Sequence, residues 1–152
     1  MSHNKSNLPL FFLFCLINIT FCSCSKDTNV NEIIPYVPVN GTINLNFYSE
    51  LNSVGNALYF DEIEASVGYN GHGFIVVRTS TSEFVVFDAS CTNDRDSEEH
   101  LEIEGILGIC PVCNSKFNLM GNGQPIEGPA RYNLKTYRNS YSPSRNELNV
   151  RN

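Results

Sequence analysis

The stretch CPVCNSKF, residues 110–117, decides how this sequence is interpreted. It holds two cysteines, Cys110 and Cys113, with two residues between them. Such a pair occurs as a redox disulfide, as half of a zinc site, or as one side of an iron–sulfur site. The residues around the pair separate these possibilities.

The residues that follow the pair exclude a thioredoxin-like disulfide. In that motif the cysteines follow a strand and open a helix, whose dipole lowers the pKa of the first thiol. Here the pair is followed by NSKFNLMGNGQP, residues 114–125. This pattern predicts a short strand and then a glycine-rich turn. No helix is expected at Cys113.

Outward from the pair, the chain consists of short strand-like runs separated by turn residues. Two of them, FIVVRTS (74–80) and FVVFDA (84–89), are joined by TSE and predict a β-hairpin. No long window has the apolar period of a helix, although residues 50–64 could hold one helical turn. The other runs are 43–48, 105–110, 115–120, 132–138 and 147–151. The sequence therefore predicts an all-β domain, a sandwich or a barrel.

The first residues have the pattern of a secretory signal. Lys5 precedes the apolar segment 8–21, which is shorter than the ~20 residues of a membrane-spanning helix. Cys24 follows the small residue Ser23, and this resembles the lipobox of bacterial lipoproteins. The resemblance implies a signal peptide (1–23) and a lipidated Cys24 that anchors the protein to a membrane. An ordinary cleaved signal is the alternative.

These features predict three parts of the chain. A lipoprotein signal peptide (1–23) is followed by a lipidated, extended tether (24–41) and a folded domain (42–152). The expected location is the bacterial cell envelope, on the periplasmic face or at the cell surface.

Charge and polar residues exclude several functions. The chain has 10 Lys and Arg against 16 Asp and Glu, a net charge of −6, and lacks a basic patch, so nucleic acid is not an expected partner. Ser90 and Ser115 have no histidine and carboxylate arranged beside them in the sequence, and His72 is interpreted as a turn residue. We find no catalytic constellation and expect no enzyme.

The cysteine count points to a shared site. Cys91, Cys110 and Cys113 remain once the signal peptide and Cys24 are set aside. Three is an odd number in a compartment where disulfides form, so either one thiol is left over or a metal holds all three. Three thiolates with His100 as the fourth ligand would make an acceptable zinc site.

The surroundings of the cysteines resemble the Rieske iron–sulfur domain family, whose cluster lies between the tips of two β-hairpin loops. In that family the first loop is Cys-x-His and the second is Cys-x-x-His. The matching segments here are 91–93 and 110–113, with a glycine turn at 121–123 and Gly-Pro-Ala at 128–130. The resemblance spans residues 73–150. It implies a [2Fe–2S] cluster and a role in electron transfer or redox sensing, with a redox partner protein.

The sequence departs from this family at the ligands. Asn93 and Cys113 stand where the two histidines are expected, and Asp96 and Val112 stand where respiratory members have a further cysteine pair. Rieske histidines raise the reduction potential, so a thiolate at Cys113 would lower it.

Three interpretations therefore stay open. In the first, Cys91, Cys110 and Cys113 hold a [2Fe–2S] cluster, with His100, Asp94 or an exogenous group as the fourth ligand. In the second, Cys91 and Cys110 form a disulfide in a cluster-free fold that serves as an interaction or structural module. In the third, the cysteines hold zinc.

Overall fold

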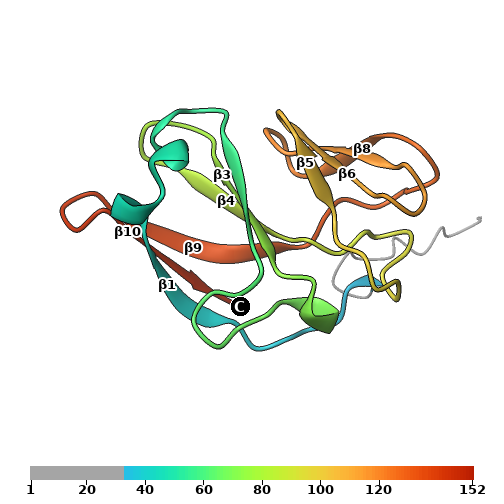
Figure 1. The fold of residues 1–152 in the computed structure, drawn as a ribbon, viewed down its shortest axis with the longest axis horizontal. Helices are drawn as coiled ribbons and strands as arrows, with labels where there is room; N and C mark the ends of the chain where they lie inside the picture. Colours follow the sequence, from blue (N-terminus) through green and yellow to red (C-terminus); the bar gives the residue numbers. More distant parts are fainter. Residues whose placement is uncertain (1–32) are drawn as a thin grey trace, which may run out of the picture.

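The computed structural model describes residues 33–152 (Figure 1). These residues form strands joined by turns and three short 3-10 helices: η1 (Leu45–Phe47), η2 (Ser49–Asn52) and η3 (Tyr69–Gly71). The strands are β1 (Asn40–Asn44), β2 (Ala57–Phe60), β3 (Phe74–Arg78), β4 (Phe84–Asp88), β5 (Glu102–Glu104), β6 (Leu107–Ile109), β7 (Lys116–Asn118), β8 (Gln124–Glu127), β9 (Thr136–Ser142) and β10 (Glu147–Arg151). The predicted signal peptide (1–23) and Cys24 lie outside the described residues.

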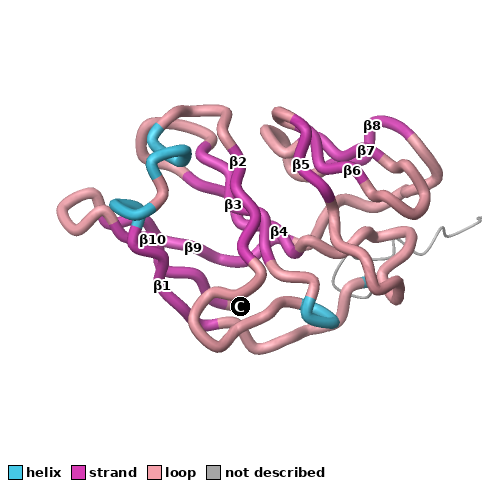
Figure 2. Tube along the Cα trace, viewed as in Figure 1, coloured by secondary structure: helices cyan, strands magenta, loops and turns pink. Residues whose placement is uncertain are grey.

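All strand pairs are antiparallel, and they build two sheets (Figure 2). The larger sheet has six strands in the order β1-β10-β9-β4-β3-β2, and the smaller has four in the order β5-β6-β7-β8. Figure 1 shows the smaller sheet, in orange, standing beside the larger one. The predicted all-β class is confirmed, and β3 and β4 form the predicted hairpin.

The centre of the larger sheet is buried on both faces. Along β3 the side chains alternate, so Phe74 and Val76 join one core while Ile75 and Val77 join another. The first core fills the inner side of the larger sheet, which is curled. The second core is shared with the smaller sheet and contains Phe117 together with the cysteines of interest. Cys91 and Cys110 are thus part of this packed core, and Cys113 packs against it.

Three strands were not predicted from the sequence, namely β2, β5 and β8, and each of them is an edge of its sheet. β5 falls inside the mostly acidic run at residues 93–104, and β8 contains Pro125. β2 follows η2 within residues 50–64, where the sequence suggested at most one helical turn. Charged residues and proline are typical of edge strands, because an edge leaves half of its backbone groups unpaired. The predicted strand at 43–48 is also shorter than expected, since the chain turns into η1 after Asn44.

The folded part starts earlier than the sequence predicted. Residues 33–41 belong to the predicted tether (24–41), yet Ile34 and Val39 are buried and β1 begins at Asn40. The backbone carbonyl of Pro35 accepts a hydrogen bond from Lys135 Nζ at 2.7 Å. Apolar side chains and backbone contacts therefore hold this segment against the domain.

No helix in the described part of the chain is both long and apolar enough to cross a membrane.

Candidate metal centre

Two loops carry the cysteines. The first loop, residues 89–101, leads from β4 of the larger sheet to β5 of the smaller one, and the second loop, residues 110–115, closes the β6–β7 hairpin. In the second loop the Cys110 N–H donates to the Ser115 carbonyl and the Asn114 N–H donates to the Cys110 carbonyl, each at 2.9 Å. Asn114 has a left-handed φ of 59°, which asparagine tolerates better than most residues.

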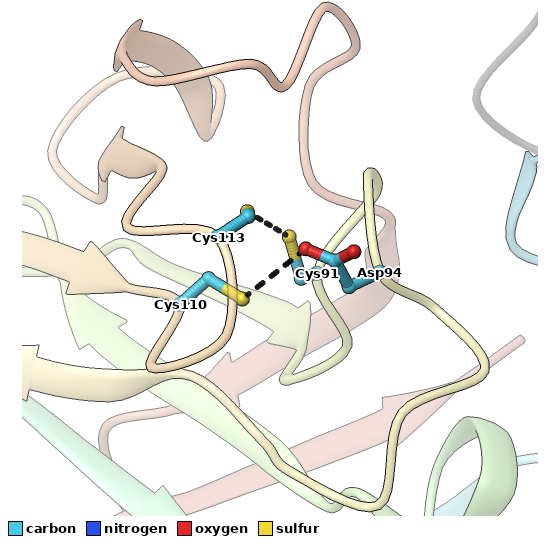
Figure 3. A group of neighbouring side chains, drawn as sticks. All are labelled: Cys91, Asp94, Cys110 and Cys113. Carbon is cyan, nitrogen blue, oxygen red and sulfur yellow. Dashed lines mark hydrogen bonds between the residues drawn. The ribbon is translucent and has the colours of Figure 1, made fainter.

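Four side chains from these loops point toward one another (Figure 3). The ligand atoms of Cys91, Asp94, Cys110 and Cys113 all lie within 4.8 Å of one another. Cys91 Sγ is 3.7 Å from Cys113 Sγ, and Cys110 Sγ is 3.8 Å from Asp94 Oδ2. Each of these contacts joins one loop to the other. The cysteines at 91 and 110 are buried, whereas Asp94 and Cys113 are half-buried.

The spacing fits one tetrahedral ion. Sulfurs bound to zinc at about 2.3 Å in a tetrahedron lie about 3.8 Å apart, and an oxygen ligand lies slightly closer. The two measured contacts, 3.7 and 3.8 Å, share no atom, so they correspond to opposite edges of such a tetrahedron. The other distances between pairs of ligand atoms are at most 4.8 Å. Three thiolates and one carboxylate are an acceptable zinc ligand set.

A two-iron cluster does not fit the same spacing. In a [2Fe–2S] cluster two irons and two bridging sulfides separate one ligand pair from the other. Ligands on different irons must therefore lie farther apart than the edges of a single tetrahedron. The four ligand atoms here enclose no such elongated space, because no two of them are more than 4.8 Å apart.

Burial controls the ionisation of the two inner thiols. Desolvation raises the pKa of Cys91 well above its ordinary value, although the backbone N–H groups of Asn93 and Asp94 act to lower it. The pKa of Cys110 is raised for the same reason, against the opposing effect of the N–H groups of Cys113 and Val112. Both thiols are therefore protonated at neutral pH until a metal displaces their protons.

The structure distinguishes the candidates for the fourth ligand by position. Asp94 joins the three cysteines, whereas His100 stacks on the ring of Tyr59 with 4.2 Å between centroids and lies outside the group. Asn93, at the expected histidine position, is exposed; its backbone N–H donates to Cys91 Sγ at 3.4 Å and its side chain donates to Asp94 Oδ2 at 3.2 Å. The fourth donor, Asp94, thus lies one residue after position 93, where the resemblance to Rieske domains led us to expect a ligand.

The Cys91–Cys110 disulfide of the second interpretation is not formed in the structure. Within residues 33–152, Cys91, Cys110 and Cys113 are all free thiols.

Ser115 positions the outer cysteine. Its buried hydroxyl lies 3.1 Å from Cys113 Sγ and accepts a hydrogen bond from the Ala130 N–H at 3.0 Å. Gly128 packs against Ser115 so closely that a Cβ would lie 2.5 Å from the Ser115 Cα, and its φ of +90° also favours glycine. The Gly-Pro-Ala turn thus fixes the second loop.

A buried hydrogen-bond network, which could not be predicted from the sequence, holds the first loop. Asp88 Oδ1 accepts from the Ser90 N–H at 2.9 Å, and Oδ2 accepts from the Tyr69 N–H at 2.8 Å and the Tyr137 hydroxyl at 2.6 Å. The partners are up to 49 residues apart in sequence. Asp88 is fully buried, so this carboxylate fixes the backbone immediately before Cys91.

His72 was interpreted from the sequence as a turn residue, but its side chain also holds the first loop in place. It is buried, with Nδ1 2.7 Å from Ser90 Oγ and Nε2 2.9 Å from the Ser97 carbonyl. A carbonyl only accepts, so His72 Nε2 donates to the Ser97 carbonyl. Ser90 is fully buried, so this pair braces the loop and does not face a substrate.

Replacing His72 by alanine is expected to lower the free energy of unfolding by about 2 kcal/mol, because a buried hydroxyl and a buried carbonyl lose their partner. Chemical denaturation of the metal-free protein measures this. A change no larger than that of His100→Ala, which removes a histidine outside the network, would contradict the assignment.

Comparisons with known proteins do not assign this chain to a family. No protein-family model matches it, and no curated protein matches it. A solved structure titled as a complex of reduced oxygenase and oxidized ferredoxin in carbazole 1,9a-dioxygenase contains a similar chain, at 15% identity and a TM-score of 0.46. The match covers 76% of this chain and 93% of that one. A likeness of this degree assigns neither family nor function, so the ligand geometry has to carry the functional argument.

Proposed function

We propose that this domain binds one divalent ion of the zinc type through Cys91, Asp94, Cys110 and Cys113. The observation that carries the proposal is the convergence of these four ligand atoms within 4.8 Å, with two opposite edges at 3.7 and 3.8 Å. The ion would join a loop that leaves the larger sheet to a loop of the smaller sheet. It would thereby stabilise the contact between the two sheets, and its binding free energy would add to that of folding.

Electron transfer or redox sensing through a [2Fe–2S] cluster is the second candidate, with a redox partner protein. It is favoured by the arrangement of the ligands as two Cys-x-x-donor pairs, one in each loop. The close spacing of the donors argues against it. We therefore derive no electron-transfer step from this geometry.

The metal content of the purified protein tests these candidates. The protein is prepared without chelators and assayed for zinc, iron, labile sulfide and reactive thiols. The proposal predicts about one zinc per chain, no labile sulfide, and thiols that react only after the metal is removed. Iron and sulfide in equal amounts would support the second candidate. A metal-free protein that neither takes up zinc nor assembles a cluster from added iron and sulfide would overturn both.

Metal affinity is expected to depend steeply on pH. Burial raises the pKa of the Cys91 and Cys110 thiols, so both are protonated in the metal-free protein and both protons must leave when the metal binds. The affinity should fall as pH falls, by at least about 100-fold for each pH unit near neutrality, because these two ligands alone displace two protons. Competition with a chelator of known pH dependence measures the slope. A slope below about tenfold per unit would show that the two thiols do not exchange their protons for the metal.

We also propose, from the sequence, that Cys24 carries a lipid that anchors the protein in the bacterial cell envelope. The small residue Ser23 before Cys24 supports this. Cys24→Ser is expected to move the protein from the membrane fraction to the soluble fraction, whereas the neighbouring change Cys22→Ser should not. Retention of the Cys24→Ser protein in membranes would contradict the anchor.

A further inference from the structure

The four ligands are not equivalent, because only one of them belongs to a residue that lines a cavity. A cavity of about 520 Å³ lies beside the centre, lined by the first loop from Thr92 to Ser97 together with Ile33 and Val112. Asp94 is part of its wall, whereas none of the cysteines at 91, 110 and 113 lines it. The volume is within the range of small-molecule sites.

Asp94 is also the ligand least fixed by its surroundings. Its Oδ2 accepts one side-chain hydrogen bond, from exposed Asn93, and otherwise contacts the Cys110 thiol. The cysteines at 91 and 110 lie in the packed core, and Cys113 is positioned by buried Ser115. A carboxylate is moreover a harder donor than a thiolate for an ion of the zinc type.

The charges around the cavity select the kind of ligand that can enter. Three thiolates and a carboxylate around a divalent ion leave an excess of negative charge, and the opposite charges of Asp96 and Arg95 at the cavity wall offset each other. The guanidinium of Arg95 is already engaged, by Asp96 at 3.2 Å and by the Ile33 carbonyl at 2.6 Å. An anion would be repelled, and a small neutral nitrogen donor would not.

We propose that Asp94 is a displaceable ligand and that the cavity is a binding site for a small neutral nitrogen donor, such as an imidazole, that coordinates the ion in its place. This inference rests on the single-ion function proposed above. It makes the centre a site with three fixed ligands and one exchangeable position, the arrangement found in zinc sites that act on or bind a further molecule.

Cobalt(II) reports on both proposals, because its visible absorption changes with the number and type of its ligands. The purified protein, Asp94→Ala and Asp94→Cys are loaded with Co²⁺ and titrated with imidazole. The Asp94→Ala protein is expected to keep cobalt and to bind imidazole at least about tenfold more tightly than the unchanged protein, since only water has to leave. Asp94→Cys supplies a fourth thiolate and should abolish the imidazole response.

The outcomes separate the two proposals. If the unchanged protein takes up no cobalt, the single-ion function itself is overturned. If the unchanged protein takes up cobalt but Asp94→Ala does not, Asp94 is an obligatory ligand and the exchangeable position is overturned. The same holds if Asp94→Ala keeps cobalt and imidazole leaves its spectrum unchanged.

Discussion

Cys110→Ser is expected to lower the affinity of the protein for Zn²⁺ by at least about 1,000-fold, more than the loss typical of a residue that only supports a ligand. Cys110 is buried in the core shared by the two sheets, and its Sγ faces Asp94 at 3.8 Å. A serine hydroxyl does not ionise at neutral pH, so it cannot replace the thiolate. Competition with a chromophoric chelator measures the affinity.

The matched control is His100→Ala. His100 lies in the first loop but stacks on Tyr59 outside the donor group, so its removal should change zinc affinity by no more than about twofold. Equal losses in Cys110→Ser and His100→Ala would contradict the ligand assignment. An unchanged affinity in Cys110→Ser would contradict it as well.

Asp88→Ala is expected to lower the free energy of unfolding by about 3–5 kcal/mol, the cost of leaving several buried polar groups without their charged partner. The carboxylate is fully buried and accepts hydrogen bonds from two backbone N–H groups and from the Tyr137 hydroxyl. One of these groups, the Ser90 N–H, belongs to the first loop itself. Equilibrium denaturation in the presence of a chelator measures the loss without a contribution from metal.

Two further substitutions test the origin of this loss. Tyr137→Phe removes one of the three hydrogen bonds and should cost about 1–1.5 kcal/mol. Asp96→Ala removes an exposed carboxylate of the same loop and should cost no more than about 0.5 kcal/mol. If Asp88→Ala were as mild as Asp96→Ala, the buried network would not support the site.

The β3–β4 hairpin could be predicted from sequence because its determinants are local. Apolar side chains fill Phe74–Arg78 and Phe84–Asp88, and a short polar segment joins them. The edge strands of the smaller sheet could not be predicted in this way. β5 and β8 are short and polar, and they become strands only because β6 and β7 offer backbone partners.

The site shows the same division between local and distant causes. The three cysteines could be grouped from spacing and from the resemblance of their loops, but the fourth donor depends on how the first loop turns after Cys91. There the backbone N–H of Asn93 is directed to the Cys91 sulfur and its side chain outward, and Asp94 faces the cysteines. The roles of Asp88 and His72 arise from partners far along the chain, which a pattern in one sequence does not reveal.

X-ray absorption at the metal edge of the purified protein tests the central claim most directly, because it measures the ligands around the ion. The single-ion account predicts a zinc edge with three sulfurs at about 2.3 Å and one oxygen or nitrogen at about 2.0–2.2 Å. It also predicts no second metal in the nearest shells. An iron edge with a neighbouring iron atom and bridging sulfides would contradict the account.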